Sequence, residues 1–251
     1  MEMQIDGIKK VPTIGIMPVP KIRTNTRDVI KLLDNNFIDI FEKHSVNYLV
    51  IPYNMAKSKL NALLPSLDGL IFPGGHLGDL YNNKLYKDYY ITQKFLVKKA
   101  KEINSLYRPF PVLGICNGYE NMILIEKNYN ITRKNIKRTF IKVEAYKNYK
   151  TRPTFSKNKW GNHFKNKLSK AKIIIHNNML AVDPAQNIDG YIMYAKSLDK
   201  NNKEFIEIIK HKKYPFYGFQ GHVEVSSKDL LDSFIKYVKI SFSKNKRIIT
   251  K

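Results

Sequence analysis

The stretch PVLGICNGYE, residues 111–120, joins an apolar run to a Gly-x-Cys-x-Gly turn and contains the single cysteine of the 251-residue chain. The pattern predicts a buried strand over residues 112–115, a tight turn at Cys116, and a helix over residues 119–126. Such a turn, the nucleophile elbow, exposes a reactive side chain at a helix N-terminus, where the helix dipole stabilises a thiolate. We therefore interpret Cys116 as a candidate nucleophile; the alternative is a small buried core residue.

A nucleophilic thiol needs a base, and His222 is the candidate among six histidines. It lies in the stretch YGFQGHVE, residues 217–224, where an apolar extended run leads into His-x-Glu. In an extended chain, residues two apart point the same way, so Glu224 is expected to orient the His222 ring that accepts the Cys116 proton. His-x-Glu is also a common surface pair, and the assignment depends on its combination with the elbow.

The third expected component is an oxyanion hole, which requires backbone N–H groups that point at developing negative charge. The stretch LDGLIFPGGH, residues 67–76, reads as a strand that runs into a Gly-Gly loop, and such a loop lets a ligand approach the backbone closely. We expect the N–H of Gly75, or of Gly74, to act together with the N–H of Asn117. A plain turn is the alternative for the two glycines.

These three stretches, in this order, resemble the class I glutamine amidotransferase-like superfamily, and within it the γ-glutamyl hydrolase branch. The resemblance extends over nearly the whole chain and includes PTIGIM, residues 12–17, which is similar to the family's first strand. Glu120 favours the hydrolases, because synthetase-linked amidotransferases usually have Gln at this position. The resemblance further implies that Glu120 and Gly74 lie near the substrate's γ-glutamyl head and that His176 is a pocket histidine at the end of a strand. A capping residue after an apolar strand is the alternative for His176.

The chain also departs from the family's pattern. Around the histidine the family commonly has a large aromatic residue and a proline, where this chain has Gly221 and Val223. Phe37 stands where γ-glutamyl hydrolases often have a tyrosine, so one hydroxyl group that could contact substrate or oxyanion is missing. These differences bear on efficiency and substrate choice more than on the class of reaction.

Apolar extended runs alternate with helical runs through the first half of the chain. The expected strands are residues 13–17, 48–51, 67–72 and 112–115, and the expected helices are residues 28–43 and 89–103. This alternation predicts an α/β fold, a three-layer sandwich with a mostly parallel, flavodoxin-like sheet flanked by helices and a site beyond the strands' carboxyl ends. In the second half, antiparallel strands are expected over residues 191–197, 204–209 and 216–219, followed by a final helix that opens at residues 226–229. With no linker in sight, one domain over residues 1–251 is expected.

The charge of the chain is strongly positive, with 44 Lys and Arg against 21 Asp and Glu. A basic surface raises the local concentration of anionic partners. Three explanations stay open: a poly-γ-glutamate substrate with a free α-carboxylate on each residue, nucleic acid, and a compositional bias that leaves lysines on solvated faces. Nucleic acid is disfavoured, because no recognisable binding motif accompanies the aromatic residues of the basic segment, residues 127–172.

Several expectations rest on what the sequence lacks. Residues 1–10 show no apolar leader pattern, and no run reaches the ~18 apolar residues of a membrane span, so we expect a cytoplasmic protein without membrane contact. A single cysteine excludes an internal disulfide. No Cys and His cluster has zinc spacing, and we expect neither a metal nor a cofactor. A homodimer stays open beside a monomer.

We therefore expect a cysteine-dependent hydrolase that cleaves γ-glutamyl amide bonds through Cys116, His222 and Glu224 and a thioester intermediate. Its substrate would be a small γ-glutamyl amine or a short poly-γ-glutamate, such as the tail of a folate. Two alternatives stay open. One is an amidotransferase subunit that supplies ammonia to a partner synthetase, and the other is a basic, polyanion-binding descendant with weak or no catalysis.

Overall fold

The structure is a computed structural model that describes residues 11–22, 29–30, 33–75, 84–155 and 173–249. The described residues form an eight-stranded mixed sheet in the order β4-β1-β5-β6-β12-β11-β10-β8. Its strands are β4 (Asn47–Val50), β1 (Thr13–Ile16), β5 (Gly69–Phe72), β6 (Val112–Ile115), β12 (Phe216–Phe219), β11 (Glu204–His211), β10 (Tyr191–Leu198) and β8 (Thr154–Phe155). The first five are parallel and the rest pair antiparallel, which confirms the mostly parallel sheet with an antiparallel extension.

Strand β12 is where the direction of the sheet changes. It pairs antiparallel with β11, as the sequence led us to expect, but it pairs in parallel with β6. Phe219 is in register with Ile115, and the N–H of Cys116 donates to the carbonyl of Phe219 at 2.8 Å. The two central strands therefore end side by side, and the residues that follow each of them meet at the same edge of the sheet.

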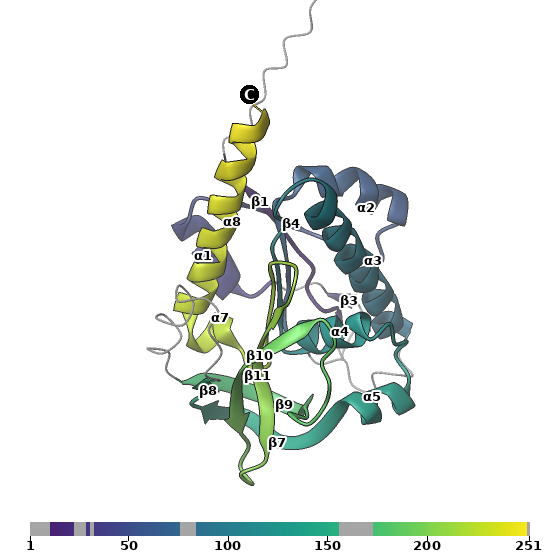
Figure 1. Ribbon diagram of the computed structural model, residues 1–251, viewed down its shortest axis with the longest axis vertical. Coiled ribbons are helices and arrows are strands. Elements are labelled where there is room, and N and C mark those ends of the chain that lie inside the picture. The colour runs from purple at the N-terminus through teal and green to yellow at the C-terminus, as the bar shows by residue number, and fades with distance from the viewer. Residues whose placement is uncertain (1–10, 23–28, 31–32, 76–83, 156–172, 250–251) are drawn as a thin grey trace, which may run out of the picture.

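Helices cover both faces of the sheet and form the outer layers (Figure 1). One face packs against α1 (Asn35–Lys43), α7 (Val223–Ser226) and α8 (Lys228–Ile249), and the other against α2 (Lys57–Leu63), α3 (Lys84–Leu106) and α4 (Asn117–Glu126). The strands supply both cores by alternation. In β6, Val112 joins the core beneath α3 and α4, whereas Leu113 and Ile115 join the core beneath α1 and α8. This two-sided burial explains why the central strands are apolar throughout.

Two helices differ from the sequence-based expectation. The helix expected over residues 28–43 begins only at Asn35, because the side chain of Asp34 accepts the N–H of Asn36 and caps the helix there. Before it, β3 (Val29–Ile30) pairs with β2 (Lys21–Ile22). In α8, the apolar positions Leu230, Leu231, Phe234, Val238 and Ile240 predict the face toward the core, but the side chain of Ile240 is 48% exposed, and Ile235 is buried instead.

Besides the β2–β3 pair, a longer two-stranded antiparallel sheet, called the second sheet below, was not anticipated from the sequence. It pairs β7 (Phe140–Thr151) with β9 (Ile174–Val182), with register shifts on both sides of Ala145. With the preceding helix α5 (Arg133–Thr139), it occupies the lower part of Figure 1, below the main sheet. The alternation of apolar and polar residues over 140–145 was the available signal. Residues 156–172 of the basic segment lie outside the described residues.

Two further observations concern what the described residues lack. None of the described helices is long and apolar enough to cross a membrane. Within the same residues, no group of three or more His, Cys, Asp or Glu side chains could hold a metal ion. A single domain over residues 1–251 stays a prediction.

Candidate active site

Cys116 occupies a strained turn between β6 and α4. Its backbone angles are φ 50° and ψ −113°, a region that side chains other than glycine rarely adopt and that costs about 1–3 kcal/mol. The flanking glycines are required by close packing. A Cβ on Gly114 would lie 2.9 Å from the backbone of Gly118, and a Cβ on Gly118 would lie 2.1 Å from the carbonyl oxygen of Phe72. The Gly-x-Cys-x-Gly pattern thus follows from the contact of β5, β6 and the first turn of α4.

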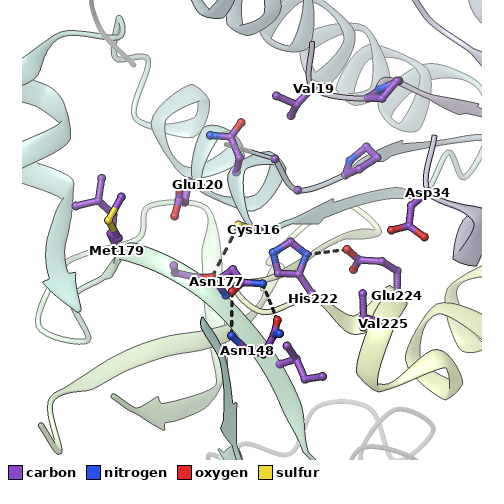
Figure 2. A pocket seen from close by; sticks show the side chains of 18 of the residues that line it. Val19, Asp34, Cys116, Glu120, Asn148, Asn177, Met179, His222, Glu224 and Val225 are labelled. Atoms are coloured by element: carbon purple, nitrogen blue, oxygen red, sulfur yellow. Dashed lines mark hydrogen bonds and ion pairs between the residues drawn. The ribbon is translucent and has the colours of Figure 1, made fainter. Parts of the chain in front are cut away.

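His222 and Glu224 follow β12 and lie beside this turn. The His222 ring lies next to Cys116, because a Cβ placed on Gly74 would meet both side chains within 3 Å. Nδ1 of His222 is 2.7 Å from Oε1 of Glu224 (Figure 2). From the sequence, the pair is expected in an extended chain. The structure instead places Glu224 in the first turn of the short helix α7, and His222 is the residue that directly precedes this helix. The two side chains meet because the chain bends at His222.

The electrostatics of this cluster favour a charged imidazole. Burial by itself lowers the pKa of His222, but hydrogen bonds to Cys116 and Glu224 and the charges of both groups raise it to about 11. The ring is therefore protonated at neutral pH, and it lies between the sulfur and the carboxylate. Such a protonated histidine is suited to stabilise a thiolate and to deliver a proton to a leaving amine.

The Gly-Gly loop after β5 lies against both side chains. A Cβ on Gly74 would lie 2.7 Å from Cε1 of His222 and 2.9 Å from the Cβ of Cys116. A Cβ on Gly75 would lie 2.6 Å from the Cβ of Val19. Both glycines line the pocket, and only a residue without a side chain fits at either position. Donation of the Gly75 N–H to an oxyanion stays a prediction.

Asn117, the other expected oxyanion donor, is the first residue of α4, and the first N–H groups of a helix have no partner within it. Its side chain donates to the hydroxyl of Tyr86 at 2.9 Å, and that hydroxyl donates to Asn121 at 2.8 Å. Gln93 donates to the carbonyl of Gly118 at 2.9 Å. This buried polar network, which no local sequence pattern indicates, fixes the first turn of α4 against α3.

Glu120 lies in the pocket, one helical turn after Cys116. Its Oε1 accepts a hydrogen bond of 3.0 Å from Gln220. Burial raises the pKa of Glu120 to about 7, although the Gln220 hydrogen bond and the charge of His222 oppose the shift. A buried carboxyl group of this kind is a suitable partner for an ammonium group, and a role at the substrate's γ-glutamyl head stays a prediction.

His176 is not among the residues that line the pocket. It lies inside β9 instead of at a strand end, because β9 continues to Val182 in its pairing with β7. The side chain is completely buried, with Nε2 3.1 Å from Oε2 of Glu207 and 2.9 Å from the hydroxyl of Thr151. The residue of β9 that approaches the thiol is Asn178, whose Oδ1 is 3.9 Å from the sulfur of Cys116.

The pocket around Cys116 has a volume of about 1300 Å³. Asp34 and the buried Phe37 contribute to it from α1 and its cap, and Lys137 and Lys142 from α5 and β7. Asn148 and Asn177 close one wall and are joined by reciprocal hydrogen bonds of 3.0 and 3.1 Å (Figure 2). The unexpected second sheet thus supplies much of the pocket's lining. The volume exceeds the usual range for small-ligand pockets, roughly 300–1,000 Å³.

Residues 26–238 match the family model for the class-I glutamine amidotransferases, which agrees with the parallel sheet, the elbow and the Cys116, His222 and Glu224 cluster. The chain belongs to this family. Within it, the chain is similar to γ-glutamyl hydrolases. It is 25% identical over 228 residues to gamma-glutamyl hydrolase 1 of Arabidopsis thaliana, a match that covers 85% of this chain and 62% of that protein.

A second relative is gamma-glutamyl hydrolase B of Dictyostelium discoideum, 25% identical over 252 residues, with 91% of this chain and 68% of that protein covered. The chain spans less than two thirds of the length of both Arabidopsis thaliana hydrolases numbered 1 and 3, at 62% and 55%. Among solved structures, a putative GMP synthase subunit from Thermoplasma acidophilum has a TM-score of 0.61 at 17% identity, covering 94% of this chain and 98% of that one. PurLQS from Thermotoga maritima has a TM-score of 0.53 at 13% identity, covering 92% and 99%. Both structures share the fold.

Proposed function

We propose that this protein is a cysteine-dependent hydrolase of γ-glutamyl amide bonds. The observation that carries the proposal is the ring of His222, which lies beside Cys116 and is hydrogen bonded to Glu224, at the wall of a large pocket. A nucleophile, a base and a group that orients the base are the parts that covalent acyl transfer requires. The relatives named above are γ-glutamyl hydrolases.

In the proposed mechanism, the thiolate of Cys116 attacks the γ-carbonyl carbon and forms a C–S bond. The carbonyl oxygen becomes an oxyanion, which accepts hydrogen bonds from the backbone N–H groups of Gly75 and Asn117. Collapse of this intermediate breaks the C–N bond, and protonated His222 donates its proton to the leaving amine. His222, oriented by Glu224, then takes a proton from water, which attacks the thioester and releases the γ-glutamyl acid and the thiol.

The pocket supports an extended, anionic substrate. Its volume of about 1300 Å³ is much larger than one glutamyl group needs, so a chain of several residues can enter. Lys137 and Lys142 line the pocket and would attract carboxylates. A poly-γ-glutamate carries one free α-carboxylate on each of its residues. Glu120, buried in the same pocket, is suited to the free ammonium group of a γ-glutamyl amine or of the first residue of an uncapped poly-γ-glutamate.

A second candidate is the glutaminase component of a synthetase. It is favoured by the fold shared with the Thermoplasma acidophilum structure and with PurLQS. The same thioester chemistry would then release ammonia from glutamine for a partner. Glu120, where synthetase-linked amidotransferases usually have Gln, weighs against this candidate.

The test is mass spectrometry of the products formed by the purified protein and by Cys116→Ala. Each is incubated with a folyl-poly-γ-glutamate, a γ-glutamyl amine and glutamine. We expect loss of glutamyl units from the polyglutamate with the wild-type protein and none with the variant. Turnover of glutamine alone would favour the synthetase component, and no turnover of any substrate by folded wild-type protein would contradict the hydrolase.

A further inference from the structure

The loop that carries His222 is held through three consecutive backbone amides. The N–H of Gln220 donates to the backbone carbonyl of Glu207 at 2.8 Å. The N–H of Gly221 donates to the side-chain Oε1 of the same Glu207 at 3.0 Å. The N–H of His222 donates to the carbonyl of Ile175 at 2.8 Å. Glu207, a residue of β11, therefore accepts hydrogen bonds from two of the three backbone N–H groups of residues 220–222.

The carboxylate of Glu207 is an unusual group to find in this place. Its side chain is completely buried, and its Oε2 lies 3.1 Å from Nε2 of His176, which is also completely buried. Burial alone raises the pKa of Glu207, but the charge and hydrogen bond of His176, with hydrogen bonds from Ser197 and the Gly221 N–H, hold it below its usual value. Burying a carboxylate is costly, and replacing a buried pair of this kind by apolar residues is often neutral for folding, which points to a role in the site.

Packing explains why the loop depends on this pair. A Cβ on Gly221 would lie 2.2 Å from Cγ2 of Ile174 and 2.8 Å from Cε1 of His176. Strand β9 therefore lies directly against the loop, in the space where a larger side chain at position 221 would stand. Without a side chain of its own, Gly221 is held by its N–H, and the acceptor of that N–H is Glu207.

The same cluster contains Thr151, and its composition resembles a second Thr-His-Glu triad. The geometry excludes this interpretation. The Thr151 hydroxyl and Oε2 of Glu207 both face Nε2 of His176, at 2.9 and 3.1 Å, so the histidine cannot relay a proton from one to the other through its two nitrogens. All three side chains are also buried away from the pocket.

We propose that Glu207, held by His176, is a positioning residue that sets the ring of His222 against the thiol of Cys116. It does so by accepting a hydrogen bond from the N–H of Gly221. The loop is then held on one side by β11 of the main sheet and on the other by β9 of the second sheet. The inference rests on the roles of Cys116 and His222 in the proposed function, but on no particular substrate.

The test measures the alkylation rate of Cys116 by iodoacetamide at pH 6, which needs no substrate and reports on the only cysteine of the chain. In the double variant His176→Leu/Glu207→Leu, apolar side chains replace the ion pair, an exchange that cores often tolerate. The Gly221 N–H then loses its acceptor, and we expect alkylation about tenfold slower, because an unsatisfied buried N–H makes the loop rearrange. Glu207→Gln keeps a carbonyl acceptor and should stay within about threefold of wild type.

The matched control is Glu126→Gln. Glu126 also pairs with a buried histidine, His211, at 3.5 Å, but this pair lies at the end of β11 and does not contact the His222 loop. We expect its alkylation rate to equal that of wild type. An unchanged rate in a folded double variant, or an equal loss in Glu126→Gln, would overturn the proposal.

Glu207→Asp gives a second test if the double variant does not fold. It retains the charge beside His176 but draws the oxygen away from Gly221, so slower alkylation is expected and an unchanged rate contradicts the inference. If wild-type Cys116 reacts rapidly and loses this reactivity in the double variant and in Glu207→Asp while no γ-glutamyl compound is cleaved, the proposed function fails and the positioning role stands.

Discussion

Nδ1 of His222 lies 2.7 Å from Oε1 of Glu224, across the boundary between a loop and a short helix. The side chain of Glu224 is only 6% exposed, so water screens this contact weakly. Because Nδ1 is taken, Nε2 is the ring nitrogen left for Cys116. The carboxylate thus fixes both the tautomer and the direction of the ring.

Glu224→Gln is therefore expected to lower kcat by about 100-fold or more while KM changes little, since an amide neither stabilises the imidazolium nor fixes its tautomer. Steady-state kinetics on the substrate found by mass spectrometry measure the effect. The control is Glu204→Gln, which removes an exposed carboxylate paired with Lys196 at 3.0 Å. Full activity in Glu224→Gln would remove Glu224 from the mechanism.

Glu120→Gln is expected to change how stability depends on pH. The pKa of Glu120 is raised to about 7 from 4.5, so the folded protein binds this proton more tightly than the unfolded chain. The stabilisation is complete below about pH 4.5 and is lost as pH rises through about 7. The variant should gain stability relative to wild type at pH 8, by up to about 3 kcal/mol, and gain least at pH 5. Urea unfolding at both values measures this, and an equal difference at the two would contradict it.

Lys137→Gln/Lys142→Gln is expected to raise KM for a poly-γ-glutamate about tenfold and to leave kcat and the turnover of glutamine unchanged, because only the longer substrate carries additional carboxylates. The effect should shrink at high salt. Lys134→Gln is the matched control, since Lys134 lies on the same helix α5 but does not line the pocket. An equal change in KM for poly-γ-glutamate and for glutamine would indicate that the lysines do not bind the additional carboxylates.

Gly118→Ala is expected to destabilise the fold by more than about 3 kcal/mol, because its Cβ would lie 2.1 Å from the carbonyl oxygen of Phe72 and backbone atoms cannot move aside cheaply. Gly69→Ala is the comparison, since its Cβ would meet the carbonyl oxygen of Pro111 at 3.1 Å and should cost less. Thermal unfolding of both variants shows which substitution costs more stability. A native melting temperature for Gly118→Ala would show that β5 and α4 are not packed as closely as described.

The local parts of the site could be predicted from the sequence because each depends on neighbouring residues. A strand that ends in Gly-x-Cys-x-Gly can make few turns other than the elbow at Cys116, and alternating runs of strand and helix lead to a parallel sheet. The contact of His222 with Glu224 was also anticipated, but its expected geometry was wrong. The short helix α7, which the local pattern does not show, brings the two side chains together.

The surroundings of the site could not be predicted in this way. Whether His176 faces the pocket or Glu207 depends on the register between β7 and β9, which shifts on both sides of Ala145. A shift of one residue turns a side chain to the opposite face of a strand, and nothing local to His176 records that shift. Short sequence patterns were enough to predict the parallel sheet, the elbow at Cys116 and the candidate base His222. The residues packed behind them could be found only in the folded structure, because strands distant in sequence meet there through long-range pairing and packing.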